Sequence, residues 1–370
     1  MIEIKKIYKK DIHELLNDSS FWNQSFLSIS KHRLLAHSKN PNSEDNDIVL
    51  LLAYIDNELL GYMGVFIDKI NIDGSEKKIS WLSTWWVHPK TKGTGIGREI
   101  LSTMYNANKG QIGISQFTPS AKRVYDKSGY FTTLKNNIGI KAVLRSNLAF
   151  LIPVLFPKIP KFDSIFKIID TFLNIFINCK LLMQKKSIVN RLNDVKIEYL
   201  NSIDSETLTV INKFNKKDIS YKSVDYFEWL KAYNWVQQAP LLEFTEKSKY
   251  QFSMYDKEFE FSYIKIKKQE ECIGFVILQK RNYVCKVLFS YYDNNKHTNI
   301  ISDIIKLQNI TQNTREIICY DEAICENLKK SNVFLYKTKK IKQSIISKVF
   351  DRSNFDNIRI NFGDGDCCFA

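Results

Sequence analysis

Three closely spaced glycines between a strand-like and a helix-like segment are the residues best suited to chemistry in this sequence. Gly93, Gly95 and Gly97 follow the β-rich segment 78–87, and residues 96–105 have the periodicity of a helix. A glycine-rich turn lets several backbone N–H groups point into one small volume, and a helix N-terminus adds about half a positive charge. We therefore expect an anion site that fits a pyrophosphate.

Two common phosphate-binding loops do not fit this stretch. A P-loop requires GxxxxGK[ST], which is absent here, and a dinucleotide fold requires GxGxxG, where Arg98 replaces the last glycine. The stretch resembles instead the pyrophosphate loop of the GNAT acetyltransferase superfamily, which follows a strand and V-x-P with the pattern [QR]xxGx[GA]. Residues 87–89 (VHP) and 92–97 (KGTGIG) match that order, except that Lys92 lacks the fork geometry of the usual arginine.

A second motif follows at the spacing that this family requires. Ala121, Tyr125, Gly129 and Tyr130 match the pattern AxxxYxxxG[FY], which GNAT proteins often carry on the next helix. The two motifs together are more specific than either alone. The resemblance covers residues 2–140.

The resemblance implies an α/β fold with a mixed sheet, acetyl-CoA as cosubstrate, and direct attack of an amine on its thioester. Backbone amides of the glycine loop would hold the pyrophosphate, and the last strand residues would present backbone groups to the thioester carbonyl. Tyr125 corresponds to the tyrosine that protonates the departing thiolate, although it could instead only pack on the sheet. The implied cosubstrate-binding residues are Trp86, Val87, Lys92, Gly93, Thr94, Gly95, Ile96, Gly97 and Arg98.

The general base is left open by the sequence. The segment 78–87 offers no carboxylate. His88 is the titratable group nearest the loop, and Asp68 ends a predicted strand; each could serve as the base or be a solvated surface residue. A water relay is a further possibility. The carboxylates of segment 362–366 (FGDGD) either belong to a simple turn or line a substrate pocket.

Three tryptophans precede the loop. Because their separation is even, we expect Trp81 and Trp85 to share one face of the strand, with Trp86 on the other. They form either part of the core or a stacking platform for a sugar or nucleobase.

Composition limits the remaining possibilities. A chain of 370 residues with 13% aromatics predicts two folded domains. The net charge of +14 is spread along the chain without long basic runs, so we expect no nucleic-acid partner. Seven cysteines at irregular spacing, without a CxxC pair, favour free thiols in a cytoplasmic protein and no metal. We expect neither a leader peptide nor a membrane span.

The pattern of elements predicts an α/β (α+β mixed sheet) protein with two GNAT-like domains. We expect a GNAT acetyltransferase domain over residues 1–145, an apolar linker over 146–190, and a degenerate GNAT-like domain over 191–370. Strands at 2–7, 48–55, 59–68 and 78–87 have counterparts of the same order in the second half. The second half lacks the glycine loop, because YYDNNKHTN stands at the corresponding position.

The apolar segment 146–186 has two interpretations. It is either a linker helix that covers a core face or an interfacial helix in peripheral contact with a membrane. The second interpretation rests on its basic flanks. These are Lys158, Lys161, Lys167, Lys180, Lys185 and Lys186.

The leading hypothesis is an acetyl-CoA-dependent N-acetyltransferase that acts on a small-molecule amine. The first hundred residues also resemble, more loosely, bacterial GNAT proteins of surface-polysaccharide loci, which points to an amino sugar or a nucleotide amino sugar. The alternatives are a non-catalytic acyl-CoA-binding or membrane-peripheral scaffold protein and a tandem GNAT aminoacyl transferase.

Overall fold

The computed structural model describes residues 1–24, 27–156, 163–233, 256 and 258–368 in two compact units. The first unit comprises residues 1–137, 215–259 and 342–370, and the second comprises 138–214 and 260–341. Both units are assembled from separated pieces of chain, whereas the sequence analysis expected contiguous domains. In the described part of the chain, no helix is long and apolar enough to cross a membrane.

The first unit is built on a mixed sheet. Its strands lie in the order β1, β2, β3, β4, β5 and β12. The first four pair antiparallel, β4 and β5 pair parallel, and β12 is antiparallel to β5. These strands are β1 (Ile2–Tyr8), β2 (Ile48–Ile55), β3 (Glu58–Ile72), β4 (Ser75–Val87), β5 (Ile112–Ile114) and β12 (Tyr336–Ser347).

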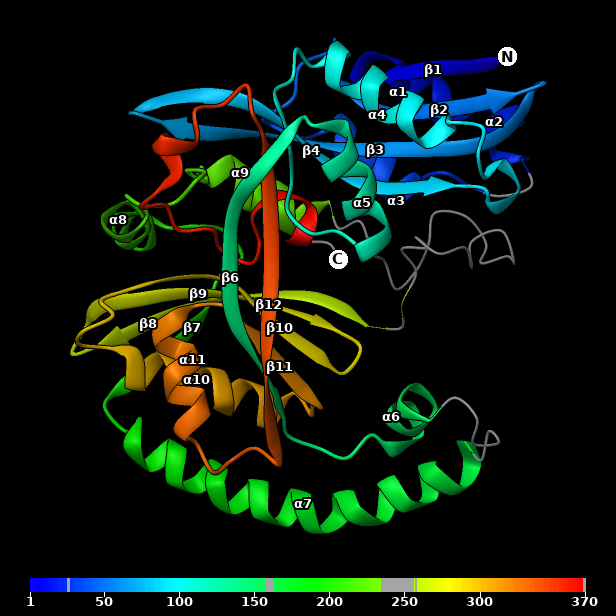
Figure 1. The fold of residues 1–370 in the computed structure, drawn as a ribbon. Coiled ribbons are helices and arrows are strands. Elements are labelled where there is room, and N and C mark those ends of the chain that lie inside the picture. Colours follow the sequence, from blue (N-terminus) through cyan, green and yellow to red (C-terminus); the bar gives the residue numbers. More distant parts are fainter. Residues whose placement is uncertain (25–26, 157–162, 234–255, 257, 369–370) are drawn as a thin grey trace. The chain divides into compact units, whose positions relative to one another are not determined.

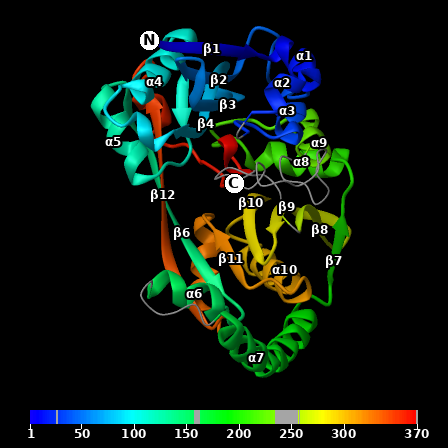
Figure 2. The same ribbon diagram turned by 90° about the vertical axis from the view of Figure 1, so that its right-hand side faces the viewer.

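Helices cover both faces of this sheet (Figure 2). On one face, α4 (Ile96–Ala107) and α5 (Pro119–Ser128) contribute to a core with Ile100, Met104 and Tyr125. The other face carries α1 (Ile12–Asn17), α2 (Ser19–Trp22), α3 (Lys31–Ser38) and α9 (Val224–Ala232).

The second unit repeats the strand pattern of the first. Its strand order is β7, β8, β9, β10, β11 and β6, with β10 and β11 parallel and β11 and β6 antiparallel. The turns that connect the matching hairpins are also alike, because Asp56 and Asn57 in one, and Gln269 and Glu270 in the other, all have positive φ. The strands are β7 (Val195–Tyr199), β8 (Phe259–Lys268), β9 (Glu271–Arg281), β10 (Val284–Tyr292), β11 (Glu316–Cys319) and β6 (Phe131–Val143).

The sixth strand of each unit comes from the other half of the chain. β6 follows the elements of the first unit in sequence but pairs with β11 of the second, and β12 follows those of the second but pairs with β5 of the first. Residues 1–145, expected to form one domain, therefore contribute a strand that pairs in the second unit, and residues 191–370 contribute one that pairs in the first.

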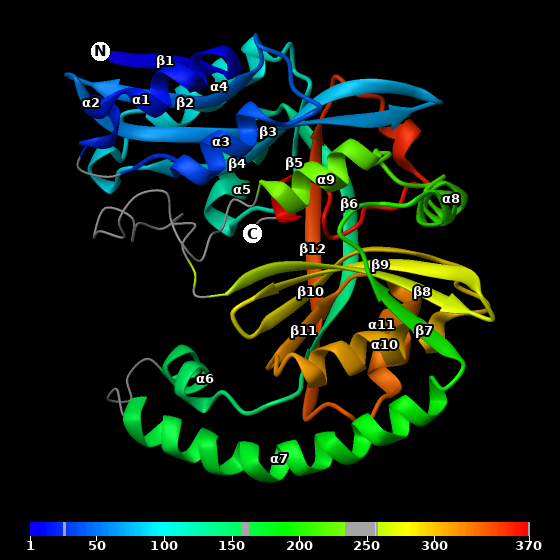
Figure 3. The same ribbon diagram turned by 180° about the vertical axis from the view of Figure 1, so that it is seen from behind.

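The described part of the second unit contains five helices. They are α6 (Leu148–Leu155), α7 (Asp163–Arg191), α8 (Ser205–Phe214), α10 (Thr298–Thr311) and α11 (Glu322–Lys330). The long, curved α7 runs beside α10 and α11, on their side away from the sheet (Figures 1 and 3). Buried residues of α7, among them Leu181 and Ile188, join the core of this unit.

Candidate active site

The glycine loop has the backbone that the sequence predicted. Strand β4 ends at Val87, a single turn follows, and Gly95 is the N-cap of α4. Gly93 and Gly95 have φ of +90° and +84°, which a side chain would disfavour. A methyl group added to either glycine would meet no atom within 4 Å, so the loop is open on this side.

Several N–H groups of the loop have no partner within the described part of the chain. These are the N–H groups of Gly93, Gly95, Gly97 and Arg98, whereas the Ile96 N–H donates to Thr94 Oγ1 over 3.4 Å. First-turn N–H groups of a helix lack intrahelical acceptors, and the helix dipole favours an anion there.

Charged side chains surround this loop. Lys92 and Arg98 are exposed, but Lys90 forms an ion pair with Glu58 at 2.5 Å. Free N–H groups beside two available cations are a donor set that fits a pyrophosphate. The residues present therefore fit the CoA moiety that the resemblance to GNAT proteins implies.

Strand β4 contains a bulge just before the loop. Tyr62 lies opposite Trp86 and Gly64 lies opposite Ser83, so β4 has one extra residue in between. Thr84, in this bulge, has φ of +47°, a strained value for a β-branched residue.

A buried arginine holds the bulge from α3. Arg33 is 2% exposed, and its guanidinium donates to Thr84 Oγ1 at 2.9 Å and to Ser83 Oγ at 3.0 Å. Gly64 leaves room for this contact, since an added Cβ would lie 2.8 Å from Arg33 Nη2. The sequence alone did not indicate Arg33, because no local pattern distinguishes it from a surface arginine.

The bulge overturns the predicted arrangement of the tryptophans. Leu82 and Trp85 both pack on the core that lies under α4. Trp81, next to Leu82, therefore faces the opposite side from Trp85, while Trp86 packs with Tyr62 on the other core. The expectation that Trp81 and Trp85 share a face was wrong because one inserted residue reverses the alternation.

Beyond Trp81, strands β4 and β5 separate, and a carboxylate bridges the gap. The two strands pair only at Ser80 with Ile112 and at Trp81 with Gly113. Asp366 accepts hydrogen bonds from Ser83 Oγ on β4 (2.6 Å) and from Ser115 Oγ after β5 (2.5 Å). Asp366 therefore lies where the strands diverge.

Asp366 is accessible, unlike its neighbours. Within residues 361–368, every residue except Asp366 is buried. The sequence of 362–366 indicates two carboxylates but not their position, because that depends on contacts with residues about 250 positions earlier in the chain. Each carboxylate oxygen has capacity beyond its one serine donor.

Tyr125 lies between the glycine loop and this carboxylate. Its ring packs 5.3 Å from that of Trp85, and a Cβ on Gly97 would lie 3.4 Å from the same tryptophan. Burial, and then the charge of Asp366, raise the pKa of Tyr125 well above its usual value. The phenol therefore keeps its proton at neutral pH and is suited to donate it.

Asp68 lies in a buried ionic cluster of the same unit. It is 0% exposed, and its oxygens accept from Lys222 Nζ at 2.7 Å, Asn42 Nδ2 at 3.0 Å and Ser220 Oγ at 3.3 Å. Burial alone would lower the pKa of Lys222, but Asp68 and Asp364 raise it. A carboxylate so fully occupied is suited to hold segments together rather than to accept a proton from a substrate.

His88 has a local role in the turn after β4. Its Nδ1 accepts a hydrogen bond from the Lys90 N–H at 3.1 Å, so the neutral ring carries its proton on Nε2. The ring also packs edge-on against Trp86. The structure brings Trp86, Val87 and the loop into one continuous stretch with Tyr125 beside it, whereas Asp68 belongs to the buried cluster.

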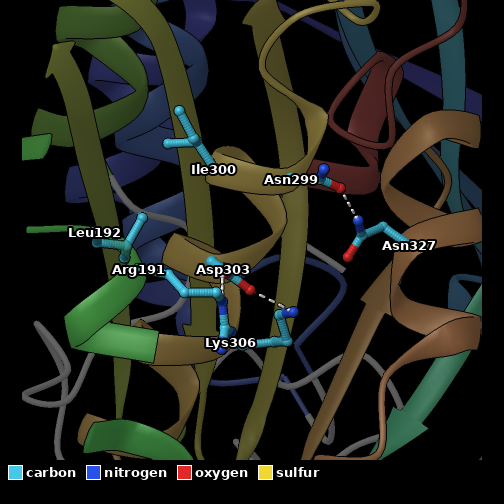
Figure 4. Close-up of a pocket in the computed structure, with 7 residues that line it drawn as sticks. All are labelled: Arg191, Leu192, Asn299, Ile300, Asp303, Lys306 and Asn327. Atoms are coloured by element: carbon cyan, nitrogen blue, oxygen red, sulfur yellow. Dashed lines mark hydrogen bonds and ion pairs between the residues drawn. The ribbon is translucent and has the colours of Figure 1, made fainter. Parts of the chain in front are cut away.

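The corresponding junction of the second unit offers no such loop. Between β10 and α10, the N–H groups of Asn295, Lys296 and His297 all donate to Asp293. A nearby cavity of about 480 Å³, lined by α7, α10 and α11, holds charges that are already paired (Figure 4). There Asp303 binds both Arg191 (2.7 Å) and Lys306 (2.5 Å).

Comparisons with known proteins concern the domain that contains this loop and the fold of the chain. Residues 3–132 match the family model described as an acetyltransferase (GNAT) domain. No curated protein sequence matches the chain.

Two solved structures share the fold over nearly the whole chain. A probable N-acyltransferase of Enterococcus faecalis aligns with a TM-score of 0.50 and 11% identity, over 96% of this chain and 74% of that one. The N-myristoyltransferase of Saccharomyces cerevisiae, with bound myristoyl-CoA, aligns with a TM-score of 0.50 and 8% identity. The alignment covers 93% of this chain and 78% of that one. At such identities the likeness concerns the fold alone.

The predicted α/β fold class is thereby confirmed, and the domain match supports an acyltransferase, as the sequence predicted. Residues 3–132 are thus similar to a GNAT acetyltransferase domain, and the whole chain shares its fold with the two solved structures.

Proposed function

We propose that the chain is an acetyl-CoA-dependent N-acetyltransferase in which a primary amine attacks the thioester directly. The observation that carries this proposal is the open glycine loop, whose free N–H groups lie beside the Trp85–Tyr125 pair. The domain match over residues 3–132 supports the class of reaction.

The cosubstrate would be held by the backbone of the loop. The N–H groups of Gly93, Gly95 and Gly97 would bind the pyrophosphate together with those of Ile96 and Arg98. The side chains of Lys92 and Arg98 would add positive charge, with Thr94 shaping the turn. Backbone groups of Trp86 and Val87 would bind the pantetheine.

In the proposed reaction Asp366 is the general base and Tyr125 is the general acid. The amine nitrogen bonds to the thioester carbonyl carbon while Asp366 accepts a proton from it, directly or through water. Backbone groups at the end of β4, after the bulge at Thr84, would stabilise the developing oxyanion. The C–S bond then breaks, and sulfur leaves with the proton of Tyr125, which the phenolate recovers from water.

Two further parts of the proposal concern the acceptor substrate and the relation between the two units. The looser resemblance of the first hundred residues favours an amino sugar, free or nucleotide-linked, as the acceptor. The matching strand orders of the two units favour a tandem arrangement in which the second copy lost its loop.

The test is CoA release from acetyl-CoA with a panel of amino sugars and nucleotide amino sugars. We expect Tyr125→Phe to lower amine-dependent release at least about tenfold, since general acid catalysis contributes about 10²–10⁴. Tyr105→Phe is the matched control, because Tyr105 stacks on Tyr130 in the same unit. Equal release in wild type and Tyr125→Phe would remove Tyr125 from the mechanism, and acetyl-CoA binding without release on any amine would favour a sensor.

A further inference from the structure

Helix α7 has apolar residues on two opposite faces. The inner face places Leu181 and Ile188 in the core of the second unit, with 1% and 0% of their surface exposed. The outer face is also apolar, but nothing in the described part of the chain covers it. Phe172 and Phe176, for example, are each 64% exposed.

The exposed apolar side chains of α7 recur every three or four residues, so they share one side of the helix. We call this set, together with exposed residues of α6, the outer apolar face. Its members are Phe150, Val154, Leu155 and Phe156 near α6, and Ile165, Ile168, Ile169, Phe172, Leu173, Ile175, Phe176, Leu182 and Met183 on α7. Patches of this extent are uncommon on monomers and mark interaction surfaces.

Helix α6 extends the face and is anchored to α7 by hydrogen bonds. The helix has the sequence LAFLIPVL and contains no buried residue. Asp170 of α7 accepts the N–H groups of Leu148 (2.7 Å) and Ala149 (3.0 Å), together with the hydroxyl of Ser146 (2.6 Å). An uncharged helix fixed at the surface in this way fits an apolar medium better than water.

The charges beside this face are cationic. Helix α7 carries four lysines and Arg191 against two carboxylates, Asp163 and Asp170, and Asp170 is used by α6. The lysines are Lys167, Lys180, Lys185 and Lys186. A second copy of the chain would bring these lysines against one another, whereas an anionic surface would complement them. Lys158 and Lys161, which the sequence analysis also noted, lie outside the described residues.

A cavity between α6 and α7 adds a site for an anionic headgroup. It measures about 360 Å³, and its lining includes Lys167, Arg315, the exposed Phe150 and Asp170, whose carboxylate already accepts the N–H groups of α6. The Lys167 ammonium has no hydrogen bond or ion pair within the described chain, and Arg315 donates to Asn147 while stacking on Tyr283. A cation is thus available where the apolar face begins.

We propose that the outer apolar face docks on the surface of an anionic lipid bilayer. The apolar side chains of α6 and α7 enter the boundary between headgroups and acyl chains, and the lysines contact lipid phosphates. The helix lies in the plane of the surface. This inference concerns a different surface from the glycine loop and does not depend on the proposed function.

The test is flotation of the full chain with vesicles of phosphatidylcholine alone or mixed with phosphatidylglycerol. We expect binding to the mixed vesicles, weakened by salt. Phe172→Asp should reduce binding to the mixed vesicles about 10- to 100-fold, because the free energy of transferring one phenylalanine side chain from water into the bilayer is lost. Lys185→Glu with Lys186→Glu should reduce it at least about tenfold on anionic vesicles.

Val349→Asp is the matched control, since Val349 is an exposed apolar residue of the first unit. It should leave flotation unchanged, and all variants should unfold at the temperature of the wild type. Flotation that survives Phe172→Asp, or no flotation at all, would overturn the proposal. So would a concentration-dependent dimer that is lost in Phe172→Asp, because the face would then pair two copies.

Discussion

The strand–helix junctions of the two units share a framework but differ in what they leave free. In each unit the fourth strand contains a bulge, at Thr84 in β4 and at Leu288 in β10, and a helix follows. In each, a carboxylate binds a serine of that strand: Asp366 binds Ser83, and Asp321 binds Ser290. The architecture around the junction is therefore common to both.

The loops differ in their hydrogen bonds. In the second unit, Asp293 accepts the N–H groups of Asn295, Lys296 and His297, so the loop satisfies itself. In the first unit, glycines at positive φ leave their N–H groups free and their outer side open. An anion site thus depends on the composition of the loop and does not follow from the fold alone.

The largest expected effect is a loss of kcat on substitution of Asp366 but not of its counterpart Asp321. Asp366→Asn should lower kcat about 10²–10⁴-fold with unchanged acetyl-CoA affinity, because the amide cannot accept the proton of the amine. Activity of this variant should rise with pH as the amine loses its proton in solution, which a merely structural role would not produce. Steady-state kinetics as a function of pH measure both.

The matched control is Asp321→Asn. Asp321 binds Ser290 and Tyr292 in the second unit. This substitution should leave kcat unchanged. A comparable loss of activity in both variants would show that the two units do not differ in catalysis.

A smaller effect, on acetyl-CoA binding, should distinguish two glycines with similar positive φ. Gly95→Ala and Gly74→Ala both place a Cβ at positive φ (+84° and +79°) where no atom lies within 4 Å. Each should cost about 1 kcal/mol of stability. Only Gly95→Ala should weaken acetyl-CoA binding, by about tenfold, as the loop shifts its N–H groups. Titration calorimetry and thermal unfolding separate the two effects, and equal affinities would remove the loop from the binding site.

The smallest effect concerns the buried cluster of the first unit. Burial, opposed by Lys222, raises the pKa of Asp364 to about 7, and its Oδ1 has no hydrogen bond in the described chain. Between about pH 4 and about pH 7 the folded state therefore holds a proton that the unfolded state has lost. The free energy of unfolding should fall as pH rises through this window.

Asp364→Asn removes this titration. The variant should gain stability relative to wild type as pH rises from about 4 to about 7, which thermal unfolding at several pH values measures. A constant difference between the two proteins would show that Asp364 titrates normally.

Local sequence patterns predicted the strand and the helix on either side of the glycine loop. The bulge in β4 and the position of Asp366 depend on contacts between residues distant in sequence. Residues 48–55 form β2 as expected, and the glycine loop precedes α4. The inserted residue at Thr84 depends on Arg33, some 50 positions away, so the alternation of the tryptophans could not be foreseen. Two separate helices, α2 and α3, precede β2, with residues 25–26 between them outside the described chain.

The most direct test is hydrogen exchange of backbone amides with and without saturating acetyl-CoA. We predict slower exchange at residues 93–98 when acetyl-CoA is added, and unchanged exchange at residues 293–298. Unchanged exchange at 93–98 with acetyl-CoA bound, or protection at 293–298, would contradict the assignment of the anion site to the glycine loop of the first unit.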